Sequence, residues 1–341
     1  KEVGVGGSIA ANVVWNVTEA SVGNDAKLEA GKNVNVTADA DETAVTAVVA
    51  GAGGGKAGVA ASVSVNAIFT DTQARIGEDV TIDAEKVNLS AHDETVVVGV
   101  AGGRAGGGGV GGGAALDTTI LAKTGRATVA DDVADGQRGK IAASKDVRVE
   151  AVASEVLTST ALGFAGGGKV GVGGAVAIGV TKNEVEARVG SGARVDASGN
   201  VLINAEDDVT AVLTSAGGGA GGQVGVGGSL AVATLLGSTK ATVGDDAEIS
   251  ARGLGDAATV YSGESVNETL KKEKPTDLGA KKTEQAKGLS VTAYRRDKLI
   301  TTAVSGAGGG TAGVAATVSA NVIAGTTEAS IGRNAKINEN N

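Results

Sequence analysis

The sequence predicts an all-β fold, namely a β-solenoid (β-helix) of stacked coils with glycine-rich corners and a narrow core of alanine and valine. Three observations predict it. A unit of about 54 residues recurs along the chain, polar and apolar residues alternate within each unit, and 57 glycines stand beside only two phenylalanines, two tyrosines and one tryptophan. A core without large side chains has to be thin, so backbone must lie close to backbone.

The repeat is anchored by a Val or Ile that Gly follows in five of the six copies, at residues 22, 76, 129, 189, 243 and 331. The spacings are 54, 53, 60, 54 and 88 residues, which one unit with two insertions explains. Self-similarity at a fixed period is typical of stacked architectures. We expect one continuous array cut from a longer chain, with units of approximately 3–56, 57–109, 110–169, 170–223, 224–311 and 312–341.

The first element of each unit is the stretch that precedes the anchor. Alanine stands two residues before it in every copy, as in Ala20, with polar residues on either side, as in Glu19 and Ser21. This period of two predicts a strand with one buried face. Thirteen residues before the anchor every copy is apolar, as in Ile9. Trp15 shares the strand face of Ile9, so we expect it to pack in the core.

Two further elements follow in each unit. The first includes residues 34–38, and the second includes residues 43–49 and ends in a glycine-rich turn at 51–55. No amphipathic helix is evident, and we expect each unit to form two coils of roughly 27 residues, about 12 coils in all. Residues 43–66 also read as two strands about a glycine-rich tip, so stacked antiparallel hairpins are the alternative.

Composition and charge exclude several classes of function. The formal net charge of −9 disfavours nucleic acid and anionic lipid as partners. No run of 18 apolar residues is present, so we expect no membrane insertion in this segment. The absence of cysteine removes disulfides, thiol catalysis and zinc–thiolate sites.

Few residues suggest catalytic or metal chemistry. His92 is the single histidine and is expected at a solvent-facing corner, and residues 163–170 resemble a phosphate-binding loop without the hydroxyl residue or the helix that such a loop needs. Acidic pairs such as Asp131-Asp132 recur at corners, where they serve turns, with structural Ca²⁺ as the alternative. We expect no enzyme, no catalytic residue and no cofactor; a polysaccharide-active β-helix enzyme is the minor alternative.

An inserted loop or decoration at 254–286 departs most from the repeat. It holds the only proline, Pro275, and a cluster of lysines. A basic cluster on an acidic array suits a contact with a glycan, a receptor or a neighbouring filament. The possible contact site comprises Tyr261, Lys271, Lys272, Lys274, Lys281 and Lys282.

The repeat unit resembles the repeat region of leukotoxin-type and filamentous-haemagglutinin-like giant bacterial adhesins. The matching stretches are residues 6–12, 18–23, 33–38, 227–232 and 327–332. The resemblance implies a secreted shaft at the extracellular surface of a bacterium, which builds filaments for adhesion, aggregation or biofilm contact, and it implies no catalytic residues. Expected partners are neighbouring copies or filament segments and a host or cell-surface glycan or receptor. A ligand-binding module acting through 254–286 is the alternative.

Overall fold

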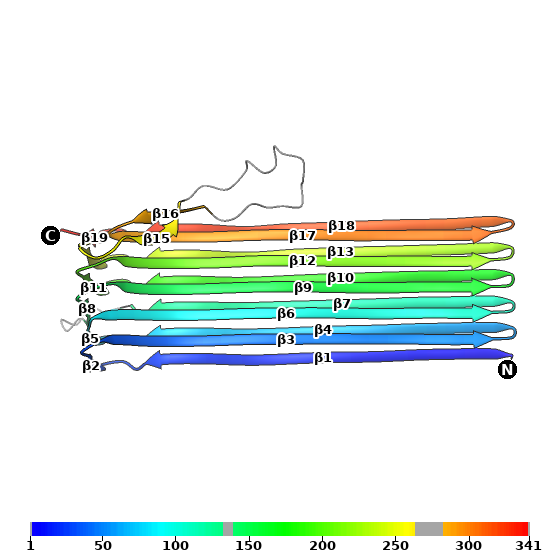
Figure 1. Ribbon diagram of the computed structural model, residues 1–341, viewed down its shortest axis with the longest axis horizontal. Helices are drawn as coiled ribbons and strands as arrows, with labels where there is room; N and C mark the ends of the chain where they lie inside the picture. Colours follow the sequence, from blue (N-terminus) through cyan, green and yellow to red (C-terminus); the bar gives the residue numbers. More distant parts are fainter. Residues whose placement is uncertain (1, 132–138, 263–281, 340–341) are drawn as a thin grey trace.

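The computed structural model describes residues 2–131, 139–262 and 282–339, which form an all-β solenoid without an α-helix (Figure 1). Three stacked sheets make up its sides, and we name them A, B and C. Sheet A contains β1 (Val3–Val22), β4 (Ala57–Ile76), β7 (Val110–Val129), β10 (Val170–Val189), β13 (Val224–Val243) and β18 (Ala312–Ile331). Sheet C contains β3 (Asn33–Gly54), β6 (Lys86–Gly107), β9 (Val147–Gly167), β12 (Val201–Gly221) and β17 (Leu289–Gly309).

Sheet B is short and closes one end of each coil, which we call the base; the opposite end, with the glycine-rich turns, is the tip. It contains β2 (Lys27–Glu29), β5 (Thr81–Ala84), β8 (Lys140–Ala143), β11 (Arg194–Ala197), β14 (Glu248–Ala251) and β19 (Lys336–Ile337). The inserted segment adds an antiparallel ribbon of β15 (Ala258–Tyr261) and β16 (Thr283–Ala286). Sheet B could not be predicted from the sequence, because strands of two to four residues are too short to show a period.

Each repeat unit forms one coil, so the expectation of two coils of 27 residues is wrong. Every strand of sheet A pairs in parallel with the strand one unit further on, as Val22 with Ile76 and Ile76 with Val129. The anchors of the repeat therefore occupy the same position in successive coils. A strand of 20 residues spans about 66 Å, whereas six strands at about 4.8 Å occupy only about 24 Å from first to last. The solenoid is thus wide across its coils and short along its stack.

The glycine-rich turns are arches between two sheets, so the antiparallel hairpin alternative is also wrong. The chain reverses at Gly55 and Lys56, but β3 pairs with β6, and β4 pairs with β1 and β7. The two strands that an arch joins face each other across the interior. Residues 34–38 and 43–49, expected as separate elements, belong to the continuous strand β3.

The interior narrows from base to tip. At the base, the three sheets enclose a core of Val, Ile, Leu and Ala, with Ile82, Leu89 and Ile203 fully buried. Toward the tip, sheets A and C touch through their backbones. A Cβ added to Gly163 would lie 1.7 Å from the carbonyl oxygen of Gly174 on the opposite wall. The expected narrow Ala/Val core is therefore present, and it thins to glycine where the walls meet.

The backbone contact decides which face of each strand points outward. Inward positions near the tip are glycine or small residues, such as Gly4 and Gly58, so the large apolar residues of the same strands lie outside. Ile9 is 80% exposed and Trp15 is 78% exposed. These two side chains do lie on one face of β1, as expected, but the expectation that this face is the core is wrong.

The corners between sheets A and B are formed by the expected acidic and amide residues. Asp25, Asp79, Asp246 and Asn334 adopt left-handed backbone conformations with φ between 54° and 58°. Asp and Asn tolerate this region better than most residues because their short side chains bond locally. Gly192 takes the same position in the fourth coil, with φ of 71°.

Candidate functional site

The described part of the expected contact site consists of Tyr261 and Lys282; Lys271, Lys272, Lys274 and Lys281 lie outside the described residues. Tyr261 ends β15, and its ring packs edge-on against Tyr294 on the outer face of β17, with ring centroids 4.9 Å apart. The backbone amide of Ser262 donates to the carbonyl oxygen of Lys282 at 3.2 Å. The ribbon is thus held to itself by backbone bonds and to sheet C by an aromatic pair.

A shallow crevice lies between this ribbon and the outer face of sheet C. Its lining includes Arg148, Glu150, Asn204, Thr259 and Tyr261. Asn204 Nδ2 donates to Glu150 Oε1 at 3.1 Å, and the Arg148 guanidinium lies 3.6 Å from the other oxygen of that carboxylate. These polar groups bond to one another, within one coil and between neighbouring coils. The crevice is therefore mainly the contact by which the insertion is held to sheet C.

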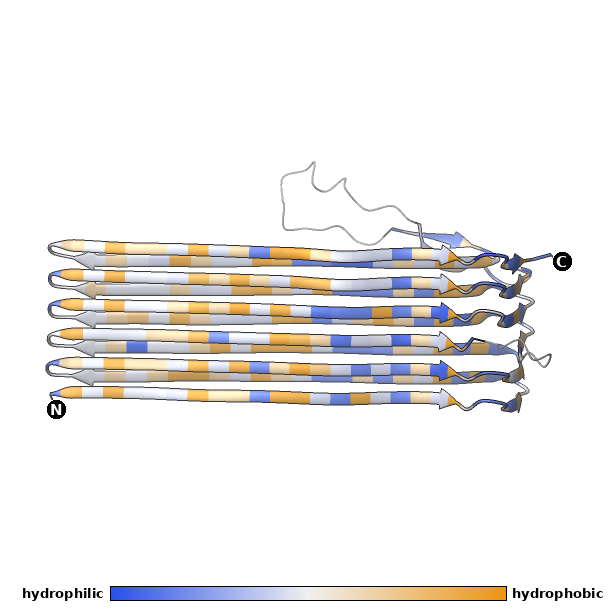
Figure 2. Cartoon of the chain, turned by 180° about the vertical axis from the view of Figure 1, so that it is seen from behind, coloured by the Kyte–Doolittle hydropathy of each residue, from blue (hydrophilic) through white to orange (hydrophobic). Residues whose placement is uncertain are grey.

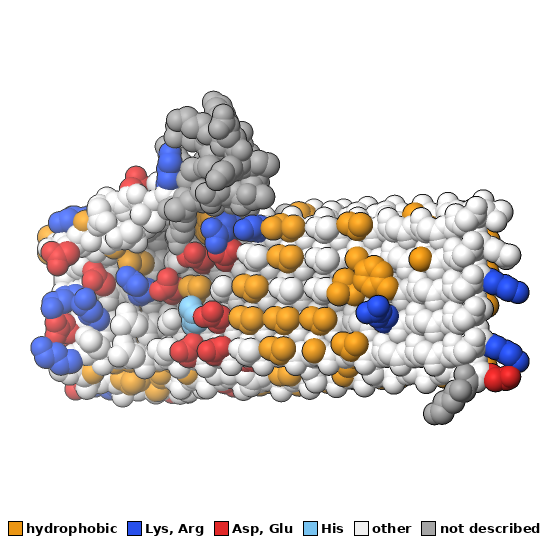
Figure 3. Space-filling model, turned by 45° about the vertical axis from the view of Figure 1, so that its right-hand side comes forward, with side chains coloured by type: hydrophobic (Ala, Val, Ile, Leu, Met, Phe, Trp, Pro, Cys, Tyr) orange, Lys and Arg blue, Asp and Glu red, His pale blue; other side chains and the backbone are white. Residues whose placement is uncertain are grey.

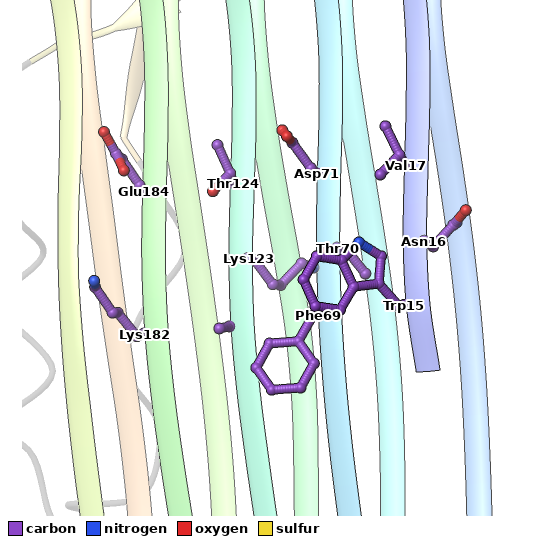
Figure 4. Close-up of a pocket in the computed structure, with 11 residues that line it drawn as sticks. Trp15, Asn16, Val17, Phe69, Thr70, Asp71, Lys123, Thr124, Lys182 and Glu184 are labelled. Atoms are coloured by element: carbon purple, nitrogen blue, oxygen red, sulfur yellow. The ribbon is translucent and has the colours of Figure 1, made fainter. Parts of the chain in front are cut away.

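A second hollow lies on the outer face of sheet A, around the only tryptophan (Figure 4). The rings of Trp15 and Phe69 come from adjacent coils, and their centroids are 5.7 Å apart. Lys182, Asp71 and Glu184 stand on the same face beside them. Such an arrangement can stack a flat ring and bond polar groups at its edge. The two carboxylates already have partners, since Gln73 donates to Asp71 at 2.8 Å and Arg126 lies 3.1 Å from Glu184.

A row of buried polar and charged side chains, which was not predicted from the sequence, crosses the interior. Lys123 of β7 is fully buried, and its Nζ lies 2.6 Å from Oδ1 of Asp93 and 3.8 Å from Oε2 of Glu155. The same ammonium donates to the carbonyl oxygens of Asp93 and Ser154, each at 3.0 Å. One cation therefore joins β6 and β9, which are neighbouring strands of the opposite wall.

The row continues into the following coils. Asn183 of β10 donates to Glu155 and, at 2.9 Å, to Oδ1 of Asp207. The guanidinium of Arg295 in β17 lies 2.5 Å from the same aspartate and 2.7 Å from Asp297. Gly237 of β13 faces this guanidinium, which lies 1.5 Å from where a Cβ would stand. A residue without a side chain at this position leaves room for the buried arginine.

Burial makes two acids of this row hold protons more tightly. Burial, helped by the nearby Asp207 carboxylate, raises the pKa of Glu155 to about 8, although Lys123 opposes the shift. Burial also raises the pKa of Asp207 to about 6, against the influence of Arg295. The row lies inside the walls, so it does not present a surface to a large ligand. It can hold coils in register, and its charge varies with pH.

A signal for this row was present in the sequence. Lys123 stands six residues before the anchor Val129, so alternation places it on the same face of the strand as Ala127, and the structure shows that this face is the inner one. The corresponding residues of neighbouring coils are Thr70 and Asn183, which are polar as well. A run of polar residues at one inward position indicates an internal network.

His92 and the stretch 163–170, the other two candidates, are parts of the solenoid framework. His92 lies on the outer face of sheet C, within strand β6 and not at a corner as expected, among acidic side chains near the base (Figure 3). The match to a phosphate loop is a tip arch, in which the amides of Gly168 and Lys169 donate to carbonyl oxygens of the preceding coil at 2.9 and 2.8 Å. A phosphate would need those amides free.

The acidic corners bond to the next coil. Oδ1 of Asp131 accepts from the amide of Ser191 at 2.7 Å, and Oδ1 of Asp245 accepts from the amide of Arg333 at 2.8 Å. These carboxylates therefore extend the backbone ladder between coils. Within residues 2–131, 139–262 and 282–339, no group of three or more His, Asp or Glu side chains is arranged to hold a metal ion.

Comparison of the chain with protein-family models, with curated proteins and with solved structures found no match. Within the described residues, no helix is long and apolar enough to cross a membrane.

Proposed function

We propose that this chain is part of the structural shaft of a bacterial cell-surface filament or adhesin, secreted and extracellular, which projects or builds fibres for adhesion, aggregation or biofilm contact. The observation that supports it best is the unbroken parallel register between coils. Each strand of sheet A pairs along all 20 residues with its neighbour, from β1 through β18. Such a stack grows by repetition, because each coil offers the next one the same ladder.

Ion pairs between side chains of successive coils also stabilise the stack. On the outer face of sheet B, Lys140 and Arg252 from the two adjacent coils both bind Asp196, each at 2.8 Å. Arg194 lies 3.1 Å from Glu248 of the following coil. Each exposed pair contributes little by itself, but repeated pairs favour one register of the charged sheet. The proposal assigns no catalytic residues.

The proposal is tested by electron microscopy of the native full-length material at its source. A shaft built from these coils is expected to be a flattened fibre about 70 Å wide, with an axial repeat of about 4.8 Å. Gold-labelled antibodies raised against this chain should then decorate fibres on the outside of the cells. Compact particles, or label confined to the cell interior, would refute the proposal.

The inserted segment supports a second candidate, a binding module for a glycan or receptor. The Tyr261–Tyr294 pair holds the described ribbon of the insertion, β15 and β16, against sheet C. Deletion of residues 254–286 leaves Arg252, Gly253, Lys287 and Gly288 between β14 and β17, where the preceding coil has three residues. A shaft keeps its fold and fibres after this deletion, whereas a binding module loses its adhesion to cells.

A further inference from the structure

The outer face of sheet A carries a surface without charge between the tip and Trp15. Its outward positions form six rows across the six strands, beginning at Val3, Val5, Gly7, Ile9, Ala11 and Val13 of β1. In these rows Thr118 and Thr234 are the only residues that are neither apolar nor glycine. We call this surface the apolar window. In Figure 2 most of the hydrophilic segments of the long strands lie toward the base.

The matching part of the outer face of sheet C is also largely apolar, with exposed side chains such as that of Val49, but it carries more polar and charged residues. It includes threonines such as Thr158 and Thr160 and the charged residues Arg104 and Lys298. The narrow interior explains why large apolar residues point outward on both sheets. An uncharged apolar surface as large as the one on sheet A is typical of a surface that meets a partner.

The apolar window has a relief of ridges and a groove. One row consists of small residues: Gly7, Ala61, Ala114, Gly174, Gly228 and Ala316. The next row toward the base consists of large ones: Ile9, Val63, Leu116, Val176, Leu230 and Val318. Their members on β4, β7, β10, β13 and β18 line an open groove of about 580 Å³ along the stack. We name them the glycine row and the leucine row.

We propose that two copies of this chain pair face to face through the apolar window, about a two-fold axis that runs along the stack midway between the glycine and leucine rows. The leucine row of each copy then enters the groove of the other. The same operation sets the Val5 row against the Ala11 row and the Val3 row against the Val13 row, so the window maps onto itself. A two-fold interface requires this self-complementarity.

The size of the window suits a second copy. Six rows cover about 36 Å along the strands, and six strands cover about 29 Å, which gives about 1,000 Å² on each copy. A stable interface needs about 800 Å² per partner. The base of each copy carries the charged side chains of sheet B. In the pair the two bases would lie at opposite ends, so the like charges of the two copies would be far apart. The inference concerns lateral pairing and does not depend on the proposed surface location.

The first test compares two matched lysine substitutions in the full chain by sedimentation velocity. Val176 lies in the apolar window and Val212 on the outer face of sheet C, and both are half-buried valines of inner strands. The wild type is expected to be a dimer. Val176→Lys should weaken dimerisation at least roughly tenfold, because the charge would be buried in the interface, and Val212→Lys should not. A monomeric wild type, or equal effects of both substitutions, overturns the proposal; circular dichroism checks that both variants fold.

A second variant separates the specific pair from a merely sticky surface. Gly228 has no atom within 4 Å of an added Cβ, so Gly228→Leu fits the single chain but fills the groove. Ridge-in-groove pairing predicts weaker dimerisation, although the surface becomes more apolar. Stronger association, or binding to phosphatidylcholine vesicles in place of dimerisation, overturns the proposal.

Cross-linking tests the axis itself, because the chain has no native cysteine. The two-fold axis sets Gly174 of one copy against Val176 of the other. An oxidised mixture of the single variants Gly174→Cys and Val176→Cys should therefore form more mixed disulfide than either variant forms with itself. A statistical mixture of products contradicts this arrangement.

Discussion

The buried Glu155 predicts that the chain loses stability as pH rises through neutrality. The pKa of this carboxyl is about 8 in the folded chain, against an ordinary value of 4.5. Folding therefore takes up a proton between these values. The stabilisation is fully present below pH 4.5 and is lost as pH rises to about 8. The raised pKa of Asp207 acts in the same direction over a lower pH range.

The magnitude follows from the size of the shift. Each pH unit within the window changes the free energy of unfolding by about 1.4 kcal/mol, so an isolated group would lose about 4 kcal/mol between pH 5 and pH 8.5. The pKa of about 8 already includes the opposing influence of Lys123, whose ammonium lies 3.8 Å away, so we expect a measured loss of about 4 kcal/mol. Glu155→Gln keeps the acceptor for Asn183 without a titrating proton, so it should remove most of this loss.

Guanidinium chloride unfolding, followed by far-UV circular dichroism at pH 5, 7 and 8.5, measures the effect. The control is Glu150→Gln, which changes the same chemical group on the outer face of the same strand. It should keep the wild-type difference between the pH values. If Glu155→Gln loses as much stability with rising pH as the wild type, the reasoning about the buried row is refuted.

Three further predictions concern glycine and tryptophan. Gly237→Ala fills the space that the buried Arg295 guanidinium occupies, so it should lower the free energy of unfolding by about 3 kcal/mol in chemical unfolding. The control Gly125→Ala, with open space around its Cβ, should lower it by less than about 1 kcal/mol. Equal losses in the two variants would contradict the contact. The added Cβ of Gly163→Ala pushes against the backbone of the opposite sheet, so this substitution should lower the free energy of unfolding by at least about 1–3 kcal/mol in the same assay. The Cβ of Gly166→Ala meets no atom within 4 Å, so this substitution should leave the free energy of unfolding nearly unchanged. Trp15 is 78% exposed, so acrylamide should quench its fluorescence in the folded monomer almost as strongly as in the unfolded chain, and a protected indole would argue for the core.

The repeat and its register could be predicted from the sequence because backbone pairing between coils acts on every residue. The anchors Val22, Ile76 and Val129 lie in one column, as the alignment of the units requires. The acidic corners could also be predicted, since Asp and Asn are among the residues that tolerate a left-handed turn. The inserted contact site could be placed in the chain, but its chemistry depends on residues beyond the described ranges.

The buried row and the outward leucine row depended on contacts between units. Lys123 is compatible with the interior because carboxylates and carbonyl oxygens of two other strands surround its ammonium, and no local pattern reveals those partners. The tyrosine pair that anchors the insertion joins residues 33 positions apart. Such contacts arise only once the chain has folded.

By itself, the sequence determined that the chain is a stack of β-coils with a unit of about 54 residues, because alternation and repetition are properties of the chain alone. The tertiary structure decided that each unit is one coil, and which face of each strand is inside. Alternation with period two defines two faces but does not say which is buried. Here the walls meet through glycine backbones at the tip, so the small residues turned inward and the large apolar ones, such as Ile9, turned out.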